Sequence, residues 1–288
     1  MNILKSLLTL ALCLMFAQLK AQTEVQNQPK HFYSLIDSAY RLSKAGDGEQ
    51  ALNTLDASLD KMTYIHQLYL DFGIKIAQKL KDQKRIEYYK EFIKKQRTRI
   101  NPELIQVFDS LIVVDQKVRS GKYSRAATYR YECLQEPDCD KSSKKYKKAY
   151  NLWKTWQITD SLNAVVLMNL YQTYGYIGEE LLGEEHFVKA YIILTHFDSD
   201  SNNAIAGSYM SDALQSGKMR PMHYAQIIDR RSHLNKETQV YWTAPYPSKE
   251  KPFEKDDIPT ILKKREELYL FGTTLSLIET KNGWYTSF

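Results

Sequence analysis

Apolar residues that recur at three- and four-residue spacings constrain the fold of this chain more than any other feature of its sequence. After a polar leader at residues 22–30, the first such run contains Phe32, Leu35, Ile36, Ala39, Tyr40 and Leu42. This spacing lines one face of a helix with apolar side chains. Gly46-Asp47-Gly48 interrupts the run, and similar runs resume at Ala51 and continue along most of the chain. The sequence therefore predicts a mostly α-helical protein.

The first two predicted helices resemble a tetratricopeptide helix pair, in which small residues let the helices approach closely. The residues at the relevant separations are Ala39, Ala51, Leu55 and Ser58. A weaker second pair covers residues 64–81 and 85–99, where Gly73 follows Ala39 by 34 residues and Tyr89 follows Leu55 by 34 residues. Two pairs are few for a free-standing repeat array, so we expect them to pack on the rest of the chain. Ordinary helical hairpins explain the pattern about as well.

Helix signals continue through the middle of the chain. Asn101-Pro102 is a favourable start because proline fits the first helical turn. Asp115 and Arg119 stand one turn apart on the helix expected to follow, so we expect their side chains to pair. A later helix is expected to begin at Thr159 or Asp160, either of which can cap it.

The helical pattern changes after Lys236. Residues 238–242, TQVYW, are β-prone, and residues 245–259 form a loop rich in proline and charge. Residues 258–270 return to a helical pattern. We therefore expect a mostly α fold of tetratricopeptide-like helical hairpins, followed by an α-helical domain with a minor β element near the C-terminus. The expected parts are a signal peptide at residues 1–21, a helical-hairpin region at 22–100 and a mainly helical domain at 101–288.

The first 21 residues have the pattern of a secretion signal. Lys5 supplies the charged start, residues 7–19 form an apolar run of 13 residues, and Ala21 is the small residue wanted at a cleavage site. An uncleaved anchor is the alternative, but the run is short for a membrane span. Cys13 follows the bulky Leu12 and does not fit lipoprotein processing. We expect export to the periplasm, the cell surface or the medium, with no transmembrane segment in the mature chain.

The composition excludes a mainly disordered chain, because 43% of the 288 residues are hydrophobic. Cleavage after Ala21 removes Lys5 and Lys20 but no acidic residue, which lowers the formal net charge from +6 to +4 and indicates no particular partner. Six lysines between Lys141 and Lys154 would suit membrane headgroups or nucleic acid, but a solvated helix face is the preferred interpretation. Export also argues against a nucleic-acid partner.

Cys133 and Cys139 are the two cysteines that remain after cleavage, and five residues that include a proline separate them. An exported compartment is oxidising, and a disulfide can close a short loop of this kind. We expect this disulfide, with a stabilisation of about 2 kcal/mol because the loop is short. A metal site would need further ligands, and no histidine lies close in the sequence.

The densest group of residues able to do chemistry lies between His196 and Ala244, where three of the six histidines occur. His196, Asp198 and Asp200 alternate, which would place three metal ligands on one side of an extended segment. The alternative, which we prefer, is a helix end followed by a polar loop. These residues are therefore weak candidates, and no metal site is assigned.

A predicted helix within this stretch carries His223, Asp229 and Arg230, with His233 close behind. Asp229 and a histidine would form an acid–base pair only if another element completed the site. A buried Arg–Asp pair that clamps helices together is an equally good interpretation.

Gln239 and Tyr241 alternate on the β-prone segment, so their side chains are expected to point the same way. They would line a ligand site or tie the proline-rich loop to the helices. No phosphate-binding glycine loop, no Gly-x-Ser-x-Gly and no His-Glu-x-x-His motif occurs. No cofactor is expected.

Five groups of residues occur in an order that resembles a bacterial family defined by sequence, whose members have no assigned function. The family marks are an Asp-Gln-x-x-Arg segment, an Asp-x-x-Asn helix before a Gly-Trp-Pro turn, a helix that ends in His, an Ala-x-x-x-Asp-Arg helix and Gln-x-Tyr-Gly-Thr-Gln. Over about residues 104–278, this chain has Asp115-Gln116-Lys117-Val118-Arg119, Asp160-Ser161-Leu162-Asn163 before Gly175-Tyr176-Ile177, His196, Ala225-Gln226-Ile227-Ile228-Asp229-Arg230 and Gln239-Val240-Tyr241-Trp242-Thr243-Ala244. The resemblance implies a fold and the position of a site, with Asp115, Gln116, Arg119, Gln239 and Tyr241 as ligand-binding candidates. It implies no reaction.

The chain departs from the family pattern in two places. Trp242 and Ala244 stand where the family has Gly and Gln, and Tyr176 and Ile177 stand where it has Trp and Pro. If the family has a site at the Gln-x-Tyr segment, this chain has lost or altered it.

Two functions fit these observations. The first is an exported, non-catalytic helical protein that binds another protein, a peptide or a cell-envelope component, and the absent catalytic motifs favour it. The second is a hydrolase with His196 as general base or metal ligand, Asp229 as its partner and Arg230 as an anion clamp. In this second hypothesis Gln239 and Tyr241 orient the substrate. We prefer the first, because isolated polar clusters often serve structure.

Overall fold

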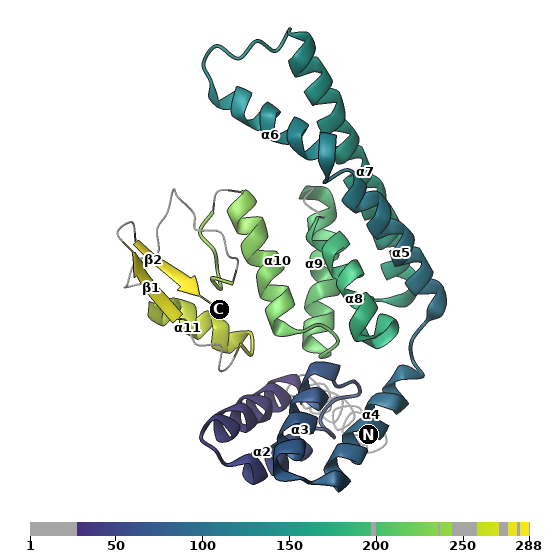
Figure 1. Cartoon of the computed structure of the whole chain (residues 1–288), viewed down its shortest axis with the longest axis vertical. Coiled ribbons are helices and arrows are strands. Elements are labelled where there is room, and N and C mark those ends of the chain that lie inside the picture. The colour runs from purple at the N-terminus through teal and green to yellow at the C-terminus, as the bar shows by residue number, and fades with distance from the viewer. Residues whose placement is uncertain are drawn as a thin grey trace, which may run out of the picture. The chain divides into compact units, whose positions relative to one another are not determined.

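A computed structural model of the chain describes residues 28–196, 200–235, 237–243, 258–270, 276–280 and 283–287 (Figure 1). The chain divides into two compact units. Unit 1 contains the described residues up to Lys95 and those from Leu214 onwards, and unit 2 runs from Gln96 to Ala213. This division differs from the expected single domain over residues 101–288. The C-terminal part joins the helical-hairpin region because Tyr269 packs against the apolar core formed there.

Unit 1 begins with a helix at residues 28–44. The helices that follow are α2 (Gly48–Asp56), α3 (Gln67–Leu80) and α4 (Gln83–Arg97). The apolar residues that predicted these helices form the core, among them Phe32, Ile36, Ala39, Ala51, Leu52, Leu55 and Leu59. Gly73 lets the helices approach closely, because a Cβ atom there would lie 2.6 Å from Cδ2 of Leu55 and 2.8 Å from Cε2 of Tyr89.

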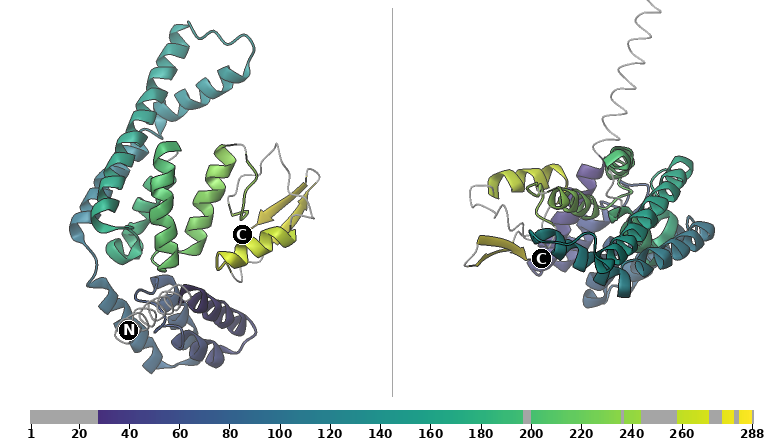
Figure 2. Two further views of the ribbon diagram at one scale, coloured as in Figure 1. Left: turned by 180° about the vertical axis from the view of Figure 1, so that it is seen from behind. Right: turned by 90° about the horizontal axis from the view of Figure 1, so that it is seen from above.

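Unit 2 is built from α5 (Pro102–Lys117), α6 (Gly121–Gln135), α7 (Lys144–Tyr174), α8 (Glu179–Thr195) and the first part of α9 (Asp200–Gln215). Helix α5 packs against α7 and α8, and α6 lies beside α7 (Figures 1 and 2). The predicted start of α5 is confirmed, since the Asn101 side chain accepts hydrogen bonds from the backbone N–H groups of Glu103 and Leu104.

The expected helix start at Thr159 or Asp160 is wrong, because both residues lie inside α7. No glycine or proline occurs between Lys144 and Tyr174, so nothing in the sequence interrupts the 31-residue helix. Ser143 caps it instead, by accepting a hydrogen bond from the backbone N–H of Tyr146.

The connection between α6 and α7 contains the predicted disulfide. Cys133 and Cys139 are bonded, with their Cα atoms 5.2 Å apart, which confirms the prediction. The lysines that follow are exposed at Lys144, Lys145, Lys147 and Lys148 on the first turns of α7. In the part of the chain that the structure describes, no helix combines the length and the apolarity that a membrane crossing requires.

The C-terminal part of unit 1 contains α10 (Pro221–Leu234), α11 (Ile258–Glu267) and an antiparallel pair of strands, β1 (Ser276–Thr280) and β2 (Gly283–Ser287). Ile278 pairs with Tyr285 at the centre of this hairpin. The β-prone residues 238–242 form no strand. The backbone of Trp242 has φ of 52°, which turns the chain there and is incompatible with an extended strand.

Candidate functional site

Unit 2 contains a buried polar cluster centred on Asp115, whose side chain is 0% exposed. Four side chains donate hydrogen bonds to its carboxylate. The donors are Gln116 Nε2 at 2.8 Å, Arg119 Nη1 at 2.7 Å, Asn163 Nδ2 at 3.3 Å and His196 Nδ1 at 3.1 Å. They come from the end of α5 and the turn that follows it, from α7 and from the C-cap residue of α8. One carboxylate therefore joins three helices.

The positions of these residues follow from the helix patterns. Asp115 lies two turns after Phe108 on the buried face of α5, so its carboxylate points into the helix contact. Asn163 lies on the buried face of α7. His196 is brought to the cluster as the C-cap of α8, which kinks at Gly183 with φ of 74°. A Cβ atom at Gly183 would lie 2.9 Å from Cδ1 of Ile100, so a glycine is required at the kink.

Arg119 bridges two carboxylates of the cluster. Its Nη1 lies 2.7 Å from Oδ1 of Asp115, which confirms the pairing predicted from their spacing, and its Nη2 lies 2.7 Å from Oδ1 of Asp160. Its guanidinium also lies 5.1 Å from the ring centre of Trp156. Burial raises the pKa of Asp160 above the usual value, while the charges of Arg119 and His196 act in the opposite direction. The cluster is thus an ion-pair network with little access to water.

The contact between Asp115 and His196 sets the tautomer of the imidazole. A carboxylate can only accept hydrogen bonds, so Nδ1 of His196 carries the proton and donates it to Asp115. In the neutral ring, Nε2 is then the acceptor. The His196 side chain is 18% exposed, whereas Asp115 is fully buried. An imidazole held in this way by a carboxylate has the arrangement that a general base needs.

The metal candidates of the sequence are only partly described. Asp198 and the side chain of Asp200 lie outside the described residues, so the set with His196 cannot be assembled. Among the residues that are described, no group of three or more histidine, cysteine, aspartate or glutamate side chains has the arrangement of a metal site.

Asp229 in unit 1 is the second fully buried carboxylate, and it accepts four hydrogen bonds from one loop. The donors are the backbone N–H groups of Val240 at 2.7 Å, Tyr241 at 2.8 Å and Thr243 at 2.6 Å, together with the Thr243 hydroxyl at 2.7 Å. Arg265 on α11 donates to the carbonyl oxygen of Tyr241 at 2.8 Å. Asp229 therefore clamps the loop onto α10.

The other candidates of the Asp229 region lie around this clamp. Arg230 is the next residue on α10 and is partly buried, and Gln239 is buried at the start of the loop. Tyr241 is partly buried, and burial raises the pKa of its hydroxyl to about 12. His196 belongs to unit 2 and Asp229 to unit 1, and their pairing stays a prediction.

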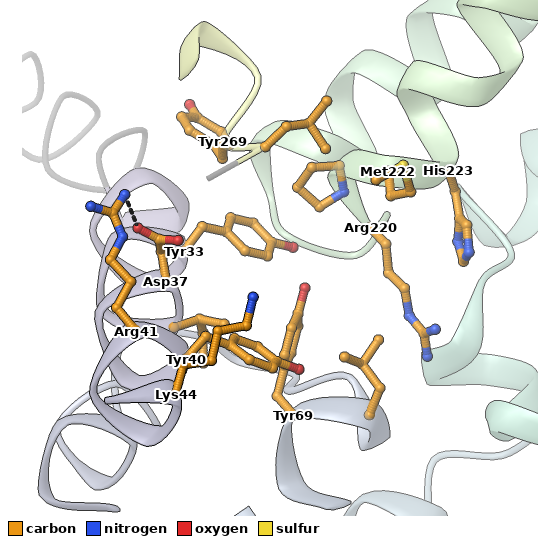
Figure 3. Close-up of a pocket in the computed structure, with 14 residues that line it drawn as sticks. Tyr33, Asp37, Tyr40, Arg41, Lys44, Tyr69, Arg220, Met222, His223 and Tyr269 are labelled. Atoms are coloured by element: carbon orange, nitrogen blue, oxygen red, sulfur yellow. Dashed lines mark ion pairs between the residues drawn. The ribbon is translucent and has the colours of Figure 1, made fainter. Parts of the chain in front are cut away.

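Unit 1 also contains a cavity that sequence reasoning missed. Its volume is about 500 Å³, and Figure 3 shows its walls. Four tyrosines line it, at positions Tyr33, Tyr40, Tyr69 and Tyr269. The rings also pack on one another, since Tyr33 stacks on Tyr269 with ring centres 5.9 Å apart and meets Tyr69 edge-on at 6.2 Å. The count of 21 tyrosines in the sequence was the available signal, but it did not say which of them gather in space.

A hydrogen bond and a tight glycine turn position the segment that leads into α10 at this cavity. His66 Nε2, before α3, lies 3.1 Å from the carbonyl oxygen of Gly217. Gly217 has φ of 70°, and a Cβ atom there would overlap the methyl group of Met62, so the tight turn requires glycine. Arg220, Pro221 and Met222 follow and form one wall of the cavity.

Comparison of the chain with models of protein families, with curated proteins and with solved structures found no match.

Proposed function

We propose that this protein is an exported helical protein of the bacterial cell envelope that binds a small molecule or short peptide in the cavity of unit 1. The cavity carries this proposal, because a volume of about 500 Å³ and a wall of aromatic rings are typical of ligand sites. The disulfide between Cys133 and Cys139 supports export, since disulfides persist in oxidising compartments. A signal peptide at residues 1–21 is part of the same proposal.

Binding of N-phenyl-1-naphthylamine, a neutral aromatic dye that fluoresces in apolar sites, tests this function in the full mature chain. Leu68→Trp fills the cavity from α3 and should abolish most of the fluorescence increase. Leu80→Trp is the matched control, because Leu80 lies on the same helix and is 44% exposed. Equal dye binding by the two variants, with unchanged helix content by circular dichroism, would exclude the cavity as the site.

The Asp115–His196 contact favours a second candidate function, an enzyme of the hydrolase type. Here His196 is the general base, Asp115 fixes its tautomer, and Arg119, which is itself paired with Asp160, holds Asp115 in place. This assignment replaces Asp229 with Asp115 as the partner of the histidine. It is supported by the distances of 3.1 and 3.2 Å from Nδ1 to the two carboxylate oxygens.

Hydrolysis of p-nitrophenyl esters and phosphates by the full mature chain tests the enzyme candidate. His196→Gln should lower any such activity about 100-fold to 10,000-fold, the usual contribution of a general base. His186→Gln, a substitution at a partly exposed histidine of the same helix, should leave the activity unchanged. Activity that is absent, or that survives His196→Gln, would rule out this candidate for these substrates.

We further propose membership of the family that the sequence resembles. The convergence of Asp115, Arg119, Asp160, Asn163 and His196 supports it, because three separate family marks then serve one cluster. The positive φ of Trp242 is a second support, since the family has glycine at this place and glycine adopts such a φ freely. A structure of a family member in which the corresponding Asp and His lie apart would contradict the proposal.

A further inference from the structure

The charged residues of the unit 1 cavity are mostly basic. Lys44, Arg41 and Arg220 line it, against a single carboxylate, Asp37. Figure 3 shows the Lys44 ammonium group pointing into the cavity near the hydroxyl of Tyr69, with Arg220 on the other side. Arg220 also lies close enough to Tyr40 that its charge opposes the rise that burial causes in the pKa of that tyrosine. The charged side chains described in the cavity wall therefore sum to a positive charge, which favours a positive potential there.

The N-terminus of α10 adds to this positive potential. The helix begins at Pro221, and Pro221 and Met222 lie in the cavity wall. The backbone N–H groups of His223 and Tyr224 donate to the carbonyl oxygen of Arg220 at 3.0 and 3.2 Å, so the first turn of the helix begins at the cavity wall. The N-terminal end of a 14-residue helix carries a partial positive charge that favours anions.

Asp37 is the acidic residue of the cavity, and its charge is already balanced. Its Oδ2 lies 2.7 Å from Nη2 of Arg41, and its side chain is 9% exposed. Its Oδ1 is buried and has no hydrogen-bond partner among the described residues. This oxygen is unpaired but shielded from water, so a ligand N–H or O–H group pairs with it only after the Asp37 side chain turns toward the cavity.

The spacing of these groups limits the size of the ligand. Asp37 and Lys44 are seven residues apart on one helix, so they share a face and lie about 10 Å apart along its axis. The tyrosine rings and aliphatic side chains lie between and around them. A ligand that reaches both ends has the length of a two-ring aromatic molecule.

We propose that the cavity binds a small organic anion with an apolar or aromatic body, whose acidic group faces Lys44 and Arg220 and whose N–H or O–H group donates to Asp37. This inference rests on the proposed binding function and adds the chemical class of the ligand. Tyrosine rings can also surround a cation, but Arg41 already pairs with the carboxylate of Asp37, and the other two charged residues of the wall, Lys44 and Arg220, are basic, which disfavours that occupant.

A pair of dyes that differ in charge tests the inference. 8-Anilinonaphthalene-1-sulfonate carries a sulfonate beside its aromatic N–H, and N-phenyl-1-naphthylamine is the same molecule without the sulfonate, so the pair tests the preference for an anion and not the hydrogen bond to Asp37. We expect the full mature chain to bind the sulfonate at least about fivefold more tightly than the neutral dye, an effect of the size that one or two partly exposed charge pairs produce. Leu68→Trp should weaken both dyes, which places them in the cavity.

Charge variants identify the residue that meets the anion. Lys44→Glu should weaken binding of the sulfonate dye about tenfold and leave the affinity for the neutral dye within twofold of the wild-type value. Lys30→Glu is the control, because Lys30 is exposed on the same helix and does not line the cavity. Thermal unfolding of each variant checks that the fold is retained.

The outcomes separate the inference from the function on which it rests. If neither dye binds, the cavity is closed to ligands and the proposed function fails. If the neutral dye binds as tightly as the sulfonate, or if Lys44→Glu and Lys30→Glu behave alike, the binding function stands and the anion inference is overturned. Tighter binding of a cationic amine analogue than of the sulfonate would assign the cavity to a cation instead.

Discussion

Asp115 in unit 2 and Asp229 in unit 1 are both fully buried carboxylates with four donors, but the donors differ in kind. Asp115 receives side-chain groups from Gln116, Arg119, Asn163 and His196. Asp229 receives three backbone N–H groups and one hydroxyl from residues 240–243. A carboxylate that pairs with backbone groups fixes the path of the chain. A carboxylate that pairs with Arg and His side chains fixes the orientation of groups that can themselves carry or transfer a proton.

The surroundings of the two carboxylates support this distinction. Residues 240–243, which bind Asp229, carry no charged side chain. The positive charge near Asp229 comes from the guanidinium of Arg265, whose own pKa is lowered by burial. The Asp115 cluster contains its own cation in Arg119 and a histidine that is 18% exposed. We therefore interpret Asp229 as a structural clamp and Asp115 as the support of a site. Four measurements test the comparison.

Asp115→Ala should have the largest effect on stability. It leaves the charge of Arg119 and the N–H of His196 without their buried acceptor, which costs about 3–5 kcal/mol of unfolding free energy. Urea unfolding measures the change. Asp109→Ala on the same helix is the control, since Asp109 is about half exposed and loses an ion pair with Lys189, which should cost far less than the loss of Asp115. If His196→Ala adds its full separate cost to Asp115→Ala, the two side chains are not coupled as the structure indicates.

Asp229→Ala should cost somewhat less, about 2–4 kcal/mol, because its donors are neutral and the loop can turn partly toward water. The difference in donor type gives a sharper measurement than stability. Amide hydrogen exchange should accelerate at Val240, Tyr241 and Thr243 in Asp229→Ala. Asp115→Ala removes no backbone hydrogen bond of this kind. Equally accelerated amide exchange around residue 115 in that variant would show that the two carboxylates do not differ in the way proposed.

Arg119→Lys should lower the unfolding free energy less than either alanine variant does, by about 1–2 kcal/mol. A lysine keeps the charge but cannot place two N–H groups on Asp115 and Asp160 at once. Arg99→Lys is the matched control, because Arg99 pairs with Glu180 while 42% exposed and should tolerate the change. Equal losses in urea unfolding would show that the bridging geometry of Arg119 contributes nothing.

The parts of this comparison that the sequence predicted are those encoded locally. The start of α5 at Asn101-Pro102, the Asp115–Arg119 pair one turn apart and the Cys133–Cys139 disulfide each depend on residues close in the chain, and the structure contains them all. The helical periodicity likewise predicted the mostly α fold.

The missed features depend on residues distant in the chain or on a competing interaction. Residues 238–242 have β propensity, but Asp229 takes their N–H groups, so no strand forms. The cavity draws Tyr33, Tyr69, Arg220 and Tyr269 from four separate segments, and no local pattern connects them. The local sequence around Asp160 predicts a helix cap, but the residue lies in the middle of α7 and accepts a hydrogen bond from Arg119.

The smallest expected effect concerns the pH dependence of the clamp region. Burial raises the pKa of Tyr241 to about 12 in the folded protein, with Tyr224 and Asp229 acting in the same direction, whereas an unfolded tyrosine titrates near pH 10. Between these values the folded state keeps a proton that the unfolded state has lost, so stability falls as pH rises. Tyr241→Phe lacks this loss.

The stability of Tyr241→Phe relative to the wild type should therefore increase as the pH is raised from 9 to 11. The increase in relative unfolding free energy should be about 1 kcal/mol or less, because the ring is partly exposed to solvent. Urea unfolding at the two pH values measures the gain. Parallel pH profiles for the two proteins would show that the Tyr241 hydroxyl is not held in a dry environment. In that case the loop that Asp229 holds is open to water at its centre, and the clamp would be weaker than its four hydrogen bonds indicate.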